Sequence, residues 1–170
     1  MKKGAVVWLC GLAGSGKSTL ATAFTKTLQL QFDNIVYLDG DVVRDLLGNF
    51  SYDKEGRVKV ALWYAKLAQI LNKQGQIVVV STISLFNEVY EFNRANLTNY
   101  FEVFVDCNLE ELHRRDQKQL YTSGHNVVGK DIAFDAPHPH FVIPNHERQN
   151  LEEKTQNLLT AFLNFYENPR

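Results

Sequence analysis

The fold is decided by one glycine-rich stretch near the start of the chain, Gly11-Leu12-Ala13-Gly14-Ser15-Gly16-Lys17-Ser18-Thr19. It fits the pattern G-x-x-x-x-G-K-[ST] of a phosphate-binding loop. The residues before it, Ala5–Cys10, form a continuous apolar run that is typical of a strand covered on both faces. The residues after it, from Leu20 onward, can open a helix. Strand, loop and helix in this order predict a site for the phosphates of a nucleotide.

Each residue type in this loop has a physical role in holding phosphate. Gly11, Gly14 and Gly16 allow backbone turns that direct successive N–H groups at one anion. The following helix presents its positive dipole end to the same point. Lys17 can contact the β- and γ-phosphates, and the hydroxyl of Ser18 can bind a metal ion. The sequence therefore predicts binding of ATP with Mg²⁺.

Length and charge limit the other possibilities. The chain has 170 residues with 18 Lys and Arg against 19 Asp and Glu, a net charge of −1. We expect one domain over residues 1–170, with no nucleic-acid or membrane partner, because a polybasic surface and an apolar run of about 18 residues are both missing from the sequence. Cys10 and Cys107 lie far apart and are expected to be reduced, buried thiols of a cytoplasmic protein.

Short β-rich runs alternate along the chain with longer segments of helical period. Five strands are predicted: Ala5–Cys10, Asn34–Leu38, Gln76–Val80, Phe101–Val105 and Phe141–Ile143. Apolar residues at helical spacing from Val60 to Leu71 predict a helix that Gly75 ends. Asn150 and Glu153 predict a capping box at the start of a last helix. Strands separated by helices indicate an α/β fold, a three-layer sandwich of about five parallel strands with helices on both faces.

The segment from about 114 to 139 differs from the rest of the chain because it is long, polar and weakly periodic. A segment of this kind inside a compact domain is either functional or disordered, and we interpret it as a mobile lid. It carries Arg115, Lys118 and Lys130. For Arg115 and Lys118, a solvated run of charges is the alternative to a role in the site.

Two carboxylates follow the second predicted strand. In a parallel sheet the carboxyl ends of adjacent strands face one crevice, so Asp39 and Asp41 are expected near the bound triphosphate. One carboxylate can hold Mg²⁺ through water, while the other accepts the proton of an attacking hydroxyl. Alternatively, Asp41 caps a helix that begins at Val42, a role that can coexist with catalysis.

Three ordered motifs resemble the adenylylsulfate (APS) kinases. They are residues 8–21, which include the phosphate loop, then Leu38-Asp39-Gly40-Asp41-x-x-Arg44, then R-D-Q-K-Q-L-Y at residues 115–121. The resemblance extends over roughly residues 5–145. In that family, a P-loop kinase transfers the γ-phosphate of ATP to the ribose 3′-hydroxyl of a nucleotide. The related kinases are commonly dimers, which implies that this chain can form a homodimer.

The resemblance implies roles for residues already singled out. Asp41 would be the catalytic base, assisted by Lys17, and Asp39 with Ser18 would hold Mg²⁺. ATP would be bound by the phosphate loop together with two residues of the lid, Arg115 and Lys118. The implied acceptor-binding residues are Asp41, Arg44, Phe50, Arg57, Val60, Ser84, Arg94 and Lys130.

The departures from the family pattern cluster on the acceptor side. Val60 stands where the family has asparagine, Trp63 stands at an arginine position, and Val127 replaces a phenylalanine that stacks on the acceptor's adenine. We therefore expect the same reaction on a different nucleotide, with cytidine diphosphoramidate, an intermediate of capsule modification, as the preferred acceptor. One alternative is an adenylylsulfate kinase that makes 3′-phosphoadenylyl sulfate. Another is a non-catalytic nucleotide-binding module.

Overall fold

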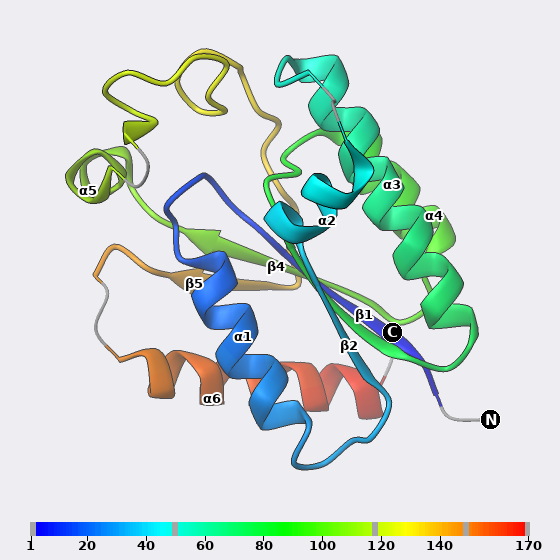
Figure 1. Cartoon of the computed structure of the whole chain (residues 1–170). Coiled ribbons are helices and arrows are strands. Elements are labelled where there is room, and N and C mark those ends of the chain that lie inside the picture. Colours follow the sequence, from blue (N-terminus) through cyan, green and yellow to red (C-terminus); the bar gives the residue numbers. More distant parts are fainter. Residues whose placement is uncertain (1–2, 49–50, 117–118, 148–149, 169–170) are drawn as a thin grey trace.

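The computed structural model describes residues 3–48, 51–116, 119–147 and 150–168. Five parallel strands form one sheet in the order β2-β3-β1-β4-β5 (Figure 1). Their bounds are β1 (Ala5–Cys10), β2 (Ile35–Asp39), β3 (Ile77–Thr82), β4 (Tyr100–Asp106) and β5 (Phe141–Pro144). Each predicted strand is present, with ends shifted by at most two residues. The predicted α/β fold is confirmed.

Helices cover both faces of the sheet (Figure 1). They are α1 (Lys17–Leu28), α2 (Gly40–Leu47), α3 (Lys54–Lys73), α4 (Asn87–Asn96), α5 (Leu109–Arg115) and α6 (Leu151–Glu167). Strand β1 lies at the centre of the sheet, and its alternate side chains enter two separate cores. One core lies on the side of α3 and α4, and the other on the side of α1 and α6. Within the described residues, no helix is long and apolar enough to cross a bilayer.

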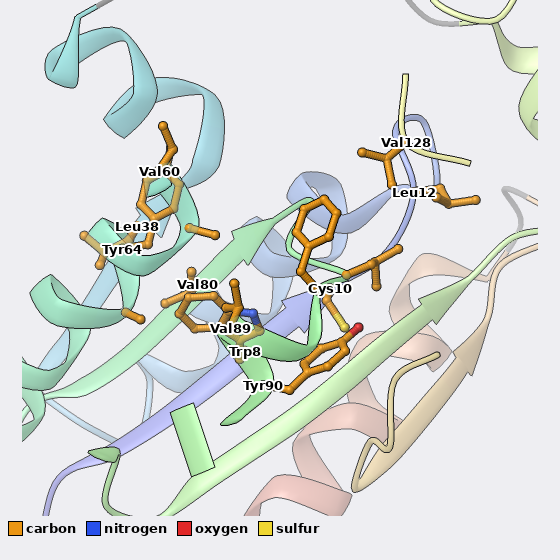
Figure 2. Close-up of a cluster of buried hydrophobic side chains, with 14 of the residues drawn as sticks. Trp8, Cys10, Leu12, Leu38, Val60, Tyr64, Val80, Val89, Tyr90 and Val128 are labelled. Carbon is orange, nitrogen blue, oxygen red and sulfur yellow. The ribbon is translucent and has the colours of Figure 1, made fainter. Parts of the chain in front are cut away.

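The core on the side of α3 and α4 reaches up to the phosphate loop. Figure 2 shows Trp8 and Tyr90 at its centre, with Leu12 of the loop and Val128 of the predicted lid at one end. Trp8 and Tyr90 are 0% and 1% exposed, so the centre of this core is tightly packed. The loop and part of the lid therefore rest on the same hydrophobic core.

Two helix ends test the capping predictions. Helix α3 ends at Lys73, and Gly75 follows with a left-handed backbone (φ +82°), as the sequence predicts. Helix α6 begins after Asn150, but the predicted capping box is wrong. Asn150 itself adopts a left-handed conformation (φ 62°), and its side chain makes no capping hydrogen bond. A capping side chain reaches the first helical N–H groups from an extended backbone, which Asn150 does not have.

Candidate active site

The phosphate loop joins the carboxyl end of β1 to the first turn of α1. Gly14 and Gly16 have left-handed φ angles of +77° and +96°, which favour glycine. A Cβ atom at Gly16 would also clash with the side-chain nitrogen of Asn145. The hydroxyl of Ser15 is buried and has no hydrogen-bond partner among the described residues, so it is available to a phosphate oxygen. The loop therefore has the backbone and the donors of an anion site.

Lys17 is held inside this loop. Its Nζ donates to the carbonyl oxygen of Leu12 at 2.7 Å, and the residue is 8% exposed. Burial lowers the pKa of Lys17 from 10.5 to about 8, against the opposing effects of Cys10, Asp41 and Asp39. Both aspartates thus lie close enough to act on the ammonium charge. The structure brings the three residues with predicted catalytic roles to one place.

Asp39, rather than Asp41, is the N-cap of α2. Its Oδ1 accepts from the backbone N–H groups of Asp41 and Val42, at 3.0 and 3.4 Å. The helix begins at Gly40, one residue after the strand ends, which leaves Asp41 in the first turn with an exposed side chain. The alternative in which Asp41 is the cap is therefore wrong, because the cap position falls on the last residue of the strand. Asp41 therefore lies in the first turn of α2 and not at its cap position.

The second oxygen of Asp39 is bound by hydroxyl groups. Its Oδ2 accepts from the hydroxyls of Tyr37 (2.8 Å) and Ser81 (3.3 Å). Partial burial would raise the pKa of Asp39, but hydrogen bonds from Tyr37, Ser18 and two backbone amides lower it below its ordinary value. An ionised carboxylate beside the Ser18 hydroxyl is a set of hard oxygen donors. This donor set fits the Mg²⁺ that a P-loop kinase uses.

The two arginines that were predicted to bind the acceptor lie beside the same aromatic ring. The Arg44 guanidinium lies 4.1 Å from the centre of the Tyr52 ring, and that of Arg57 lies 5.5 Å from it. Arg44 Nη2 donates to the Ser51 carbonyl at 2.9 Å. Arg57 donates through Nε to the Tyr52 carbonyl (2.9 Å) and through Nη2 to the Asn126 carbonyl (2.7 Å). The resemblance implies that both arginines bind the acceptor and that Phe50, with Tyr52, stacks on its base, and Phe50 lies outside the described residues.

Arg115, the last residue of helix α5, is hydrogen-bonded to the phosphate loop. Its side chain is 2% exposed and pairs with Glu111 at 2.6 Å. Its two remaining nitrogens donate to the carbonyls of Gly14 (3.2 Å) and Asn145 (2.7 Å). A solvated charge is therefore the wrong interpretation of Arg115, because its side chain is buried and hydrogen-bonded to three acceptors. Lys118 lies outside the described residues.

Two residues at the loop had no predicted role. The Tyr121 hydroxyl donates to the carbonyl of Ala13 at 2.8 Å, which joins the start of the predicted lid to the loop. Asn145 Nδ2 donates to the carbonyl of Ser15 at 2.6 Å. Tyr121 belongs to a motif already quoted, and Asn145 directly follows the fifth strand. The rule that strand ends line the site could have identified Asn145.

Comparison with known proteins agrees with this arrangement. A model of the adenylylsulphate kinase family matches residues 3–143. The chain belongs to this family. It is 50% identical over 156 residues to the cytidine diphosphoramidate kinase of Campylobacter jejuni, and the match covers 89% of this chain and 92% of that protein. The protein is thus a kinase, and the resemblance predicted from three motifs is confirmed.

Other members of the family match less closely but over most of the chain. The adenylyl-sulfate kinase of Pseudomonas aeruginosa is 39% identical over 141 residues, which is 78% of this chain and 72% of that protein. Among solved structures, the APS kinase of Mycobacterium tuberculosis in complex with AMPPNP and APS has a TM-score of 0.85 and 27% identity. The match covers 96% of this chain and 99% of the other. The P-loop kinase architecture is therefore shared along the whole fold.

Three of the predicted acceptor residues take part in packing or pairing within the fold. Val60 is 3% exposed and belongs to the core beneath α3. Ser84 is fully buried, and its hydroxyl accepts from the Trp8 indole nitrogen at 2.8 Å. Arg94 lies in the last turn of α4 and pairs with the buried Glu102 at 2.9 Å. Val60 lies one helical turn after Arg57 on α3, whereas the side chains of Ser84 and Arg94 bond to Trp8 and Glu102.

Lys130 lies in the segment that was predicted to be a lid. Its side chain is exposed, and its Nζ donates to the carbonyl of Gly124 at 3.1 Å. This segment packs on the phosphate loop, where a Cβ at Gly129 would come within 2.9 Å of Leu12. Val127, which replaces the family's stacking phenylalanine, is buried in the same core. In this structure, Val127 belongs to the hydrophobic core that also contains Leu12 and Ala13 of the phosphate loop.

Proposed function

We propose that the protein transfers the γ-phosphate of ATP to the ribose 3′-hydroxyl of cytidine diphosphoramidate. The observation that carries the proposal is the 50% identity to a kinase named for this acceptor, against 39% to an adenylyl-sulfate kinase. The family's polar and aromatic acceptor positions are apolar here at Val60 and Val127, and both side chains are buried. Because both side chains are buried in the core, the acceptor contacts that the family makes through these two positions are lost here, which suits an acceptor other than adenylylsulfate.

Adenylylsulfate remains a second candidate acceptor. The family model and several relatives bear the adenylylsulfate kinase name, and one of them is 39% identical to this chain. Both acceptors are nucleotides with a phosphate beside the ribose, so the two reactions would use the same donor site and the same base. They differ in the base and in the group attached to the phosphate.

Asp41 would act as the base in this reaction. Its carboxylate accepts the proton of the acceptor hydroxyl as that oxygen attacks the γ-phosphorus of ATP, and the bond from this phosphorus to the β–γ bridging oxygen breaks to release ADP. Lys17 and the loop N–H groups stabilise the charge on the phosphates. Ser18 and Asp39 would hold Mg²⁺, which neutralises phosphate charge when bound. The reaction needs alignment of these groups more than covalent chemistry from the protein.

Arg44 and Arg57 would bind the phosphates of the acceptor. A guanidinium group can bond two phosphate oxygens at once, which gives both affinity and orientation. Two such groups gathered on one side of α2 suit an acceptor with more than one negative charge. They would place the ribose of the acceptor next to Asp41, which lies one helical turn before Arg44.

Asp41→Asn tests the proposed base. This change keeps the shape of the side chain but removes its basicity, so we expect kcat to fall by roughly 10²- to 10⁴-fold while ATP affinity is retained. Asp45→Asn, which removes an exposed carboxylate from the same helix, is the matched control and should leave kcat unchanged. A near wild-type rate in the Asp41 variant would refute the assignment. Failure of the wild type to transfer phosphate to any acceptor would favour a non-catalytic nucleotide-binding module.

A further inference from the structure

Tyr52 is the residue around which the two acceptor-side arginines are arranged. The ring lies within cation–π distance of both guanidinium groups, at 4.1 Å from Arg44 and 5.5 Å from Arg57. The same short segment also accepts a hydrogen bond from each arginine, through the carbonyl oxygens of Ser51 and Tyr52. The side chain and the backbone of this segment thus bind one pair of cations.

Holding two guanidinium groups this close has an electrostatic cost. Burial and then the charge of Arg44 lower the pKa of Arg57, whereas Tyr52 opposes this shift. The negative face of an aromatic ring offsets part of the repulsion between the cations. An anion placed between the two guanidinium groups would relieve the rest. Two guanidinium groups held by one short segment suit a phosphate, because each can donate to two of its oxygens.

The segment that carries the ring is fixed to the fold. Ser51 Oγ donates to Asp53 Oδ1 at 2.8 Å, and the same oxygen of Asp53 caps α3 by accepting from the N–H of Gly56 at 2.8 Å. A Cβ atom at Gly56 would clash with the carbonyl oxygen of Ser51, so the segment lies directly on the helix start. Tyr52 itself is 56% exposed, so it contributes little to the core. Its position is therefore set by α3, while its ring faces the arginines.

We propose that Tyr52 is a positioning residue for phosphoryl transfer. It holds Arg44 and Arg57 together as one site for the phosphates of the acceptor nucleotide, and thereby sets acceptor affinity. This inference rests on the proposed function, since it takes the acceptor phosphate as the ligand of the two arginines. It applies to either candidate acceptor because both carry that phosphate.

The test compares Tyr52→Leu with Tyr52→Phe in the full chain. Loss of the ring in Tyr52→Leu should raise the KM for cytidine diphosphoramidate by roughly 5- to 30-fold, the effect of two cation–π contacts at an exposed site. The KM for ATP and the melting temperature should change little. Tyr52→Phe keeps the ring and should retain most of the acceptor affinity. Adenylylsulfate is assayed in parallel with each variant.

The outcomes separate this inference from the proposed function. An unchanged acceptor KM in Tyr52→Leu would overturn the role of Tyr52, as would an equal rise in the KM values of acceptor and ATP. Loss of acceptor affinity in Tyr52→Phe would also overturn it, because the hydroxyl would then be the active group. Turnover of adenylylsulfate alone, with its KM raised in Tyr52→Leu, would reject the proposed acceptor and support the positioning role. No turnover of either acceptor by the wild type would reject both.

Discussion

Ser84→Ala separates a structural role of this residue from the acceptor contact predicted by its sequence position. Trp8 and Ser84 are both fully buried, and the indole N–H donates to the Ser84 hydroxyl at 2.8 Å. Without the hydroxyl, the indole N–H would be left unpaired in an apolar core, which costs about 1–3 kcal/mol. For a chain of this size, 1 kcal/mol corresponds to about 2–4 °C in Tm, so we expect a decrease of roughly 4–8 °C for a loss of about 2 kcal/mol.

Thermal unfolding followed by circular dichroism measures this decrease, and steady-state kinetics measures the acceptor KM of the same variant. Ser123→Ala is the matched control, because Ser123 is exposed and its hydroxyl donates to the Gln119 carbonyl at 3.2 Å. Its Tm should stay within about 2 °C of the wild type, since such surface changes fall within about 0.5 kcal/mol. A raised acceptor KM in Ser84→Ala with an unchanged Tm would refute the reasoning and restore Ser84 to the acceptor site.

Lys17 and Tyr121 give two further predictions at the phosphate loop. Because burial lowers the pKa of Lys17 to about 8, its charged form destabilises the nucleotide-free fold below pH 8, and this penalty is relieved as the pH rises toward 10.5. ATP needs the charged form, so its affinity by calorimetry should fall by up to tenfold per pH unit above pH 8. Lys17→Met should abolish that slope, and a wild-type affinity that stays flat from pH 8 to 9.5 would contradict the prediction. Tyr121→Phe leaves the Ala13 carbonyl without its 2.8 Å donor. It should lower stability by about 1 kcal/mol and raise the KM for ATP several-fold, and an unchanged KM would show that this bond does not support the loop.

The parts of the site that could be predicted from sequence are those that local geometry sets. The phosphate loop, Asp39 and Asp41 each follow a buried strand of the parallel sheet, and parallel strands end at one edge. Once the strands are identified, the parallel sheet alone predicts that these residues lie close to one another. The proximity of Arg44 to Asp41 is equally local, because both lie on one short helix.

The contacts of three predicted acceptor residues depend on packing between segments that are distant in the sequence. Val60 belongs to the apolar stripe of its helix, and in the structure it packs in the core as that stripe predicts. Its position in the family motif had indicated an acceptor contact. The hydroxyl of Ser84 accepts a hydrogen bond from Trp8, which lies 76 residues earlier in the chain on β1. Arg94 neutralises the buried Glu102, a charge that would be costly without a partner. A motif alignment does not show which of these residues contact one another.

The contacts that Tyr52 and Asn145 make in the structure were not predicted from the sequence. Tyr52 was considered only as a stacking residue beside Phe50, whereas its ring lies beside arginines of the two helices that flank it in the chain. Asn145 donates to the carbonyl of Ser15, which lies 130 residues earlier, and this contact forms only when the end of β5 lies beside the phosphate loop.

The most direct test of this account is a ³¹P NMR measurement of the products formed from ATP and an acceptor panel. The panel contains cytidine diphosphoramidate, adenylylsulfate and cytidine diphosphate. We predict that cytidine diphosphoramidate gains a phosphomonoester signal at its 3′-oxygen with release of ADP, faster than either other acceptor. Efficient phosphorylation of adenylylsulfate alone would contradict the proposed acceptor, and a phosphate on any atom other than the ribose 3′-oxygen would contradict the proposed reaction.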